Sequence, residues 1–164
     1  MARKILRDTY SEPVYYTLIG ISCHLKDYRL SYLLNNKLEF VFTKQQDLVI
    51  TLQEKNEATN FSFYFYKDDD QINSYWLIGN RNEEYVLLPE LKQLDFLLMV
   101  EGDFKKNRKD TLLKVVSSIP NVLTAYEIKL SGIRNFENLL TEMEIHLMNI
   151  FRKPRTKFET HLNK

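Results

Sequence analysis

The chain has 164 residues, of which 44% are hydrophobic and 13% aromatic, so it is long enough and apolar enough to bury a core as one domain. Its 23 basic and 22 acidic residues leave a formal net charge of only +1, which excludes a general electrostatic attraction to nucleic acid or to an anionic membrane. A single cysteine, Cys23, excludes an intrachain disulfide and a cysteine-based zinc site.

No segment has the pattern of a targeting or membrane-spanning sequence. Residues 1–10 lack an apolar run of signal-peptide length, and no later stretch approaches the roughly 20 apolar residues of a spanning helix. Four glycines and four prolines are few, which argues against linkers and glycine-rich phosphate loops. We therefore expect a cytoplasmic single domain over 1–164 with no cofactor and no membrane association. Its folded core should cover 12–151, followed by a basic, mobile tail at 152–164.

The first elements are predicted to be a buried strand, a helix and a hairpin. The apolar run from Val14 to Cys23 is typical of a strand buried on both faces, and it places the Cys23 thiol in the core. Helical spacing predicts a helix near 26–36, which carries Asp27 and Arg29. Residues 40–43 and 48–52 are expected to pair with each other as a hairpin around the polar turn 44–47.

Residues 61–66 alternate between phenylalanine and polar or tyrosine side chains. This pattern predicts a strand with its phenylalanine side in the core and Ser62, Tyr64 and Tyr66 facing outward. Residues 75–79 are expected to return as its antiparallel partner. The aspartates between them, 68–70, are interpreted as a solvated hairpin tip, because carboxylates on adjacent residues point in different directions and lack the glycine spacing of a calcium loop.

The stretch 87–96 combines a proline, two carboxylates and an apolar run. Pro89 restricts the preceding residue to extended backbone and can open a short helical turn, whose free N–H groups Glu90 would cap. Asp95 begins an alternating strand and therefore needs donors, either backbone N–H groups or Arg29. The structural interpretation is a capping Glu90 and a hydrogen-bonded Asp95. The alternative is a ligand-binding or catalytic carboxylate pair.

A basic cluster follows the strand expected at 96–101. Lys105, Lys106, Arg108 and Lys109 lie before and at the start of a helix predicted at 108–119, and a strand is predicted at 122–128. Basic residues bind phosphates and exposed aromatic residues stack on bases, so this cluster, the outward tyrosines and the basic tail predict a nucleic-acid contact. An RNA-binding accessory protein is therefore one alternative function, although the sequence lacks the motifs of a ribonucleoprotein sheet.

The last segment carries an apolar stripe at alternating steps of four and three residues. This spacing predicts a helix over 134–151. Its stripe must be covered by the domain's own sheet or by another chain. We expect a homodimer through this helix, because closed two-fold assemblies are the commonest oligomers, and docking on its own sheet is the rival explanation. The stripe consists of Phe136, Leu140, Met143, Leu147 and Ile150 or Phe151.

Three phrases of the sequence resemble one family. Residues 87–96 are similar to the I-P-E-x-x-x-V-D-Y signature of the IPExxxVDY family of small bacterial proteins, with Leu88, Leu94 and Phe96 in place of Ile, Val and Tyr. Residues 27–35 resemble the family's helix after the first strand, and residues 119–128 resemble its closing motif. The resemblance covers roughly Tyr15 to Leu140, and the chain then continues beyond it. Because no biochemical role is established for that family, the resemblance implies no particular reaction.

The succession of strands with isolated helices predicts an α+β fold. We expect a mainly antiparallel, twisted sheet of about six or seven strands with helices packed mainly on one face. The three histidines lack metal-ligand spacing and no nucleophile elbow occurs, so no catalytic residue and no metal ligand is assigned.

The leading functional interpretation is a non-catalytic protein-interaction or self-associating module. A small enzyme that uses Glu90 and Asp95 as acid and base, helped by Arg29 or His24, is the other alternative. The candidate site consists of Pro89, Glu90, Asp95, Asp27 and Arg29.

Overall fold

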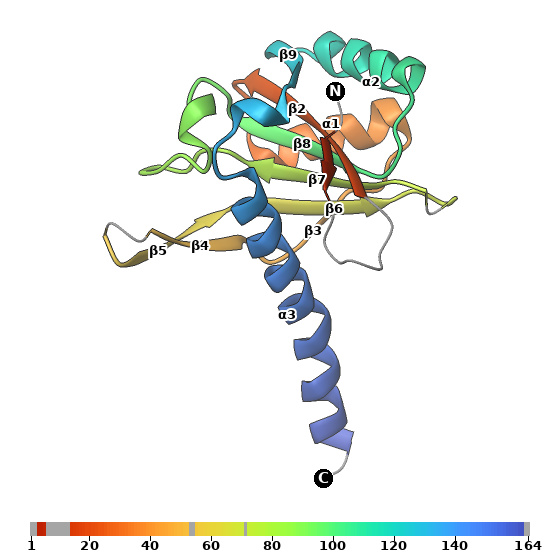
Figure 1. Ribbon diagram of the computed structural model, residues 1–164. Helices are drawn as coiled ribbons and strands as arrows, with labels where there is room; N and C mark the ends of the chain where they lie inside the picture. The colour runs from red at the N-terminus through yellow and green to blue at the C-terminus, as the bar shows by residue number, and fades with distance from the viewer. Residues whose placement is uncertain (1–2, 6–13, 53–54, 71, 163–164) are drawn as a thin grey trace.

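The computed structural model describes residues 3–5, 14–52, 55–70 and 72–162, with side-chain surroundings for 14–52, 55–70 and 72–151. These residues form an α+β fold around a seven-stranded sheet in which each pair of neighbouring strands is antiparallel (Figure 1). The predicted fold class is confirmed.

Along the described chain, runs of strands are interrupted by single helices or 3₁₀ turns. Their bounds are β1 Arg3–Ile5, β2 Val14–Cys23, α1 Asp27–Leu38, β3 Thr43–Lys44, β4 Leu48–Leu52, β5 Glu57–Phe61, β6 Phe63–Lys67, β7 Ser74–Gly79, the 3₁₀ turn η1 Pro89–Leu91, β8 Phe96–Glu101, α2 Lys106–Ser118, β9 Val122–Ile128, the 3₁₀ turn η2 Leu130–Gly132 and α3 Phe136–Leu162. The strand order is β1-β2-β8-β7-β6-β3, and β9 also pairs with β2.

Strand β2 lies inside the sheet, which explains its continuous apolar sequence. Strand β8 pairs along one edge of β2, from Tyr16 to Ile21. The other edge pairs first with β1 and then, from Leu18 to Cys23, with β9. Because both edges are paired and both faces are covered, the prediction of a doubly buried strand with a core Cys23 is confirmed.

The two faces of the sheet bury two separate apolar clusters. Helices α1 and α2 cover one face, where Leu30 and Val116 pack against Ile19 and Leu98. Helix α3 covers the other face, where Phe136 is buried. Two of the three helices thus share a face as expected, and α3 closes the face that the other two leave open (Figure 1).

The hairpin expected between 40–43 and 48–52 is wrong. Strand β3 pairs with β6, and β4 pairs with β5 to form a separate two-stranded sheet. The segment 61–66 is accordingly split at Ser62 into two strands. The reason is that 43–52 and 57–67 run alongside each other as one long antiparallel ribbon, which bends at 45–47. The polar residues 44–47 mark that bend and not a chain reversal.

The tyrosines predicted to face outward are covered. Tyr64 is only 3% exposed, and Tyr66 stacks on Phe40 with ring centroids 4.7 Å apart. The alternation of side chains along β6 is as predicted, but helix α1 and the segment that follows it cover the second face. A period-two pattern distinguishes the two faces of a strand, and it does not tell whether the second face is left in water.

Helix α3 is longer than predicted. It runs to Leu162, whereas the pattern placed its end at 151 before Pro154. An internal proline removes one helical hydrogen bond and distorts the axis locally, and the remaining bonds allow the helix to continue. Its first turns lie on the sheet, and the rest extends away from the body (Figure 1). Within the described ranges, no helix combines the length and the apolarity needed to cross a membrane.

Candidate functional site

The proline turn of the 87–96 motif forms as predicted. Leu88 is extended, with φ −115° and ψ 99°, and Pro89 opens the 3₁₀ turn η1. A residue that sequence reasoning missed holds this turn. The Asn80 amide is fully buried and donates to the carbonyls of Leu91 at 2.8 Å and Leu94 at 2.9 Å. Its Oδ1 accepts the Leu88 N–H at 3.0 Å. The only sequence signal was an asparagine directly after an apolar strand.

Asp95 accepts hydrogen bonds from the end of β2. Its Oδ2 accepts the Cys23 backbone N–H at 3.0 Å and lies 3.4 Å from the Ser22 hydroxyl. The pairing of β2 with β9 shifts register between these two β2 residues, so the ladder is irregular there. The carboxylate satisfies the Cys23 N–H at this irregularity. The prediction that Asp95 accepts a hydrogen bond from a backbone N–H is confirmed. The donor is the Cys23 N–H and not Arg29.

Glu90 is exposed in the first turn of η1. Glu90 makes no hydrogen bond within the described part of the chain, so it does not cap the turn through its side chain. What remains of the predicted cap is the attraction between the negative carboxylate and the positive end of the turn. Arg29 is also exposed, and its guanidinium carbon lies 5.7 Å from the centre of the Tyr32 ring. Neither side chain approaches Asp95 as an acid–base partner would.

A groove of about 450 Å³ opens where β2 ends and α1 begins. It brings together two residues of the predicted site, Asp27 and Asp95, and places His24 beside them. Pro89, Glu90 and Arg29 are not among the residues that line it. Its walls consist of Cys23, His24, Leu25, Lys26, Asp27, Lys44, Asp47, Asn60, Ser62, Arg81, Asn82, Asp95 and Phe96.

Asp27 and Lys44 of this groove make contacts that hold the fold. The Tyr64 hydroxyl donates to Asp27 Oδ2 at 2.8 Å, and Lys44 Nζ lies 3.2 Å from the same oxygen. Burial alone would raise the pKa of Asp27, but these two donors outweigh it and the pKa lies below its ordinary value. Burial, followed by the Asp27 carboxylate, raises the pKa of the Tyr64 hydroxyl well above its ordinary value. Asp27 therefore remains ionised and ties α1 to β6.

The same groove offers no reactive thiol and no metal site. Cys23 is buried, and burial raises the pKa of its thiol, which disfavours the nucleophilic thiolate. Among the described residues, no group of three His, Cys, Asp or Glu side chains is placed to hold a metal ion. Arg81 donates to the Lys92 carbonyl at 2.8 Å and so braces the loop around η1.

Two of the four basic residues at 105–109 contact other parts of the protein, and the other two are exposed to solvent. Lys109 lies 2.7 Å from Glu127 Oε2 on β9. Arg108 contacts side chains of the β6–β7 region, whereas Lys105 and Lys106 are exposed. Two of the four predicted nucleic-acid contacts therefore bind within the protein. Because the β6 tyrosines are also covered, the RNA-binding alternative loses the exposed tyrosines and part of the basic cluster as support.

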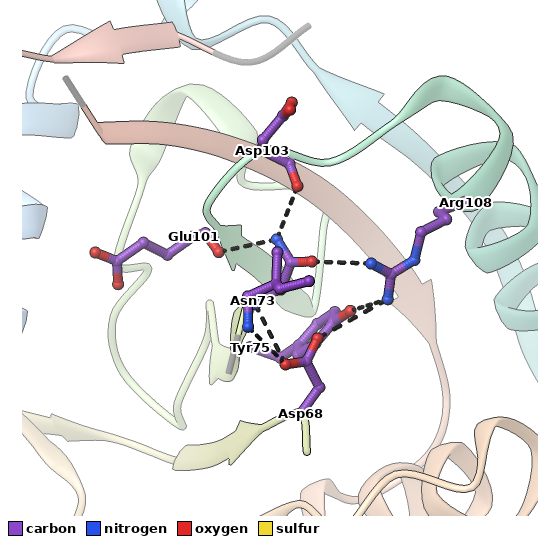
Figure 2. A network of polar contacts seen from close by, with 7 residues as sticks. Asp68, Asn73, Tyr75, Glu101, Asp103 and Arg108 are labelled. Atoms are coloured by element: carbon purple, nitrogen blue, oxygen red, sulfur yellow. Dashed lines mark hydrogen bonds and ion pairs between the residues drawn. The ribbon is translucent and has the colours of Figure 1, made fainter. Parts of the chain in front are cut away.

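Arg108 belongs to a network centred on Asn73, which is fully buried (Figure 2). The Asn73 amide donates to the carbonyls of Glu101 at 3.2 Å and Asp103 at 3.1 Å. Gly102 between them has φ +106°, and a Cβ there would lie 2.9 Å from the Asn73 amide nitrogen. Glycine is needed because the chain turns in a left-handed conformation around the amide. The network joins the start of α2 to the end of β8.

The N-terminal half of α3 is docked on the sheet. Phe136 meets Tyr16 edge to face with ring centroids 6.0 Å apart, and His146 Nε2 lies 2.8 Å from the Gln46 carbonyl oxygen. Most of the predicted stripe is buried here: Phe136, Leu140, Met143 and Ile150. A second set of apolar side chains is left in solvent, namely Ile145 at 49%, Met148 at 49% and Phe151 at 60% exposure.

Comparison of the sequence with known protein families gives no match, and comparison with curated proteins gives none either. The resemblance of residues 87–96 to the IPExxxVDY signature therefore stays a prediction.

Proposed function

We propose that this protein is a cytoplasmic, non-catalytic interaction module that forms a homodimer through α3. The supporting observation is that α3 extends beyond the sheet while Ile145, Met148 and Phe151 stay exposed on it (Figure 1). Exposed apolar residues that gather on one element favour a protein contact more than scattered ones do. The predicted stripe docks on the sheet except for Phe151, so the dimer would use Phe151 together with Ile145 and Met148.

The apolar contact alone would give a weak dimer. Burying a fully exposed side chain of this size is worth roughly 1.5–3 kcal/mol, and these three are about half exposed. Burying six such side chains in a dimer would contribute on the order of 5–9 kcal/mol. The cost of association is about 4–15 kcal/mol, so this burial alone is about as large as the cost it must offset. A further attraction is needed, and the charges of α3 supply it.

Most acidic residues of α3 precede its basic residues in the sequence, with Glu159 as an exception. Acidic residues lie in its first part, at Glu137, Glu142 and Glu144, and a basic group follows at 152–157 with Arg152, Lys153, Arg155 and Lys157. Two copies related by a two-fold axis across the exposed apolar set would run antiparallel. The acidic part of each helix would then face the basic part of the other, and complementary charges favour this register over a parallel one.

The first test is the mass of the protein in solution. Light scattering after size-exclusion chromatography should show a dimer fraction that rises with protein concentration. Replacement of both Met148 and Phe151 by serine should give a monomer with an unchanged circular dichroism spectrum. Tyr28→Ser is the matched control, because Tyr28 is 67% exposed on α1 at the opposite face of the sheet, and this variant should dimerise normally.

Two results would contradict the dimer. The intact protein could stay monomeric up to about 1 mM, which corresponds to an association free energy weaker than about −4 kcal/mol. Alternatively, the double serine variant could dimerise as the intact chain does. These substitutions test the interface more specifically than a truncation after Leu140 would, because truncation would also remove the buried Met143 from the fold.

A further inference from the structure

Arg108 is held in place mainly by uncharged partners. Its NH1 donates to Asn73 Oδ1 at 3.0 Å and its NH2 donates to the Tyr75 hydroxyl at 3.2 Å (Figure 2). The nearest carboxylate oxygen, Asp68 Oδ2, lies 3.9 Å away. The other oxygen of Asp68 accepts the Ile72 N–H at 3.0 Å, so this carboxylate is engaged with the hairpin backbone. The guanidinium is thus oriented by two neutral hydrogen-bond partners, and its ion pair with Asp68 is long.

The two hydrogen-bond partners of Arg108, Asn73 and Tyr75, are neutral and fixed in position. Both amide donations of Asn73 go to backbone carbonyls, so its oxygen must point toward the guanidinium. Tyr75 is fully buried, and burial raises the pKa of its hydroxyl despite the opposing effect of the guanidinium. A preorganised arginine that keeps an exposed edge is suited to a planar anion, because its N–H groups match the spacing of carboxylate oxygens.

A cleft of about 250 Å³ lies beside this arginine. Its apolar wall consists of Leu38, Phe40, Tyr75, Phe104 and Leu112. The rings adjoin one another, with Phe40 4.7 Å and Phe104 6.1 Å from Tyr75 between centroids. Among the described residues that line the cleft, Arg108 is the only charged one, and its side chain is 46% exposed. Asn107 and Thr111 complete the lining as neutral polar residues.

We propose that this cleft binds a small carboxylic acid with an aromatic or branched apolar body. The carboxylate would pair with the Arg108 guanidinium, and the apolar body would lie against Phe40, Phe104 and Leu112. An ion pair beside aromatic walls is stronger than one in open water, because less solvent screens it. Sites for drug-sized ligands measure roughly 300–1,000 Å³, so this smaller cleft fits a molecule of about one ring with a short acidic arm. This site is independent of the α3 dimer.

The test uses three probes of matched shape and different chemistry. 3-Phenylpropionate carries both parts, 3-phenylpropanamide lacks the charge, and acetate lacks the apolar body. Amide chemical shifts of the ¹⁵N-labelled intact protein are followed as each probe is added. The phenylpropionate should saturate shifts at residues 104–112 and around Leu38. The other two probes should bind at least about tenfold more weakly, which corresponds to about 1.4 kcal/mol.

Variants assign the binding to the proposed site. Arg108→Gln should weaken binding of phenylpropionate at least tenfold, whereas Lys106→Gln, on the same helix and exposed, should leave it unchanged. Because Arg108→Gln also removes contacts to Asn73 and Tyr75, Thr111→Trp is a second variant that fills the cleft and keeps those contacts. It should block binding while the melting temperature stays within a few degrees of that of the intact protein.

Three outcomes would overturn the proposal. The phenylpropionate could fail to saturate, the neutral amide could bind equally well, or the shifts could map to a surface away from residues 104–112. An equal loss of affinity for phenylpropionate in Lys106→Gln and Arg108→Gln would also overturn it, because it would indicate that the probe is attracted to positive charge in general.

Discussion

Single residues with several hydrogen bonds hold the irregular parts of this protein. Asn80 uses one buried amide to bind three backbone groups around η1, and Asn73 uses its amide to bind two backbone carbonyls of the turn after β8 and the Arg108 side chain. Buried backbone groups outside strands and helices must find partners, and an asparagine supplies both donors and an acceptor. These two amides therefore fix the loops that carry the proline motif and Arg108.

Asn80→Ala should be strongly destabilising. It would leave the Leu88 N–H and the Leu94 carbonyl without this partner, whereas the Leu91 carbonyl keeps the Leu94 N–H at 2.9 Å. Each unpaired buried group costs about 1–3 kcal/mol. We expect a loss of about 3 kcal/mol or more in the free energy of unfolding by urea. Asn36→Ala, on the exposed side of α1, should change it by no more than about 0.5 kcal/mol. Similar values for the two variants would show that Asn80 does not hold the turn.

Asp27 should make stability depend on pH in the acid range. Its folded pKa lies below the unfolded value of 3.8, so its contribution is fully present above that value and is lost as the pH falls through the folded pKa. The stability difference between the intact protein and Asp27→Asn should be constant above about pH 5 and shrink below about pH 4. Urea unfolding at a series of pH values measures it. A difference that stays the same down to pH 3 would contradict the role assigned to Tyr64 and Lys44.

At the scale of elements, α3 combines two parts with different surroundings. Its first turns bury Phe136 and Met143 against the sheet, and its later turns extend away from the body (Figure 1). The stability of a helix in a protein comes mostly from packing of its apolar face. The docked part should therefore contribute to folding, whereas the later part should matter for association.

Phe136→Ala and Phe151→Ala separate these two contributions. Phe136 is fully buried, so its truncation should cost about 3–5 kcal/mol of unfolding free energy. Phe151 is 60% exposed, and its truncation should cost no more than about 0.5 kcal/mol at concentrations where the chain is monomeric. Chemical unfolding at micromolar concentration gives both values. A large loss for Phe151→Ala in the monomer would place that side chain in the fold instead of at an interface.

At the scale of the whole molecule, both faces of the sheet are already covered by the chain's own helices. Exposed apolar side chains remain on several elements, and the set on α3 is too small to drive tight association without charge. The Debye screening length falls from about 10 Å at 0.1 M salt to about 3 Å at 1 M salt, so attraction between surface charges weakens. If the helices pair antiparallel, the dimer should weaken about tenfold over this range, which corresponds to several surface ion pairs.

Glu142→Lys tests the orientation of the two helices. In an antiparallel dimer it places like charges together, so it should weaken dimerisation at low salt and match the intact protein at 1 M salt. Sedimentation equilibrium at the two salt concentrations measures both dissociation constants. In a parallel dimer, position 142 of one helix would face position 142 of the other, and the substitution would leave the low-salt dissociation constant unchanged.

Much of the local structure could be predicted from the sequence. The proline turn at 89, the buried strand 14–23 and the backbone acceptor role of Asp95 all follow from the preferences of adjacent residues. Such preferences act over a few residues, so a local pattern contains them. The pairing of strands was less predictable, because β3 and β4 reach partners in the next ribbon and the polar bend between them resembles a hairpin turn.

The sequence by itself determined the α+β class, the positions of most strands and helices, and the presence of an apolar stripe on the last helix. Only the tertiary structure decided which partners these elements take. It placed the stripe on the chain's own sheet, covered the tyrosines of β6, and brought Arg108 to Asn73 across 35 residues. The reason is physical: periodicity encodes which side of an element is apolar, while the covering surface comes from residues distant in the chain.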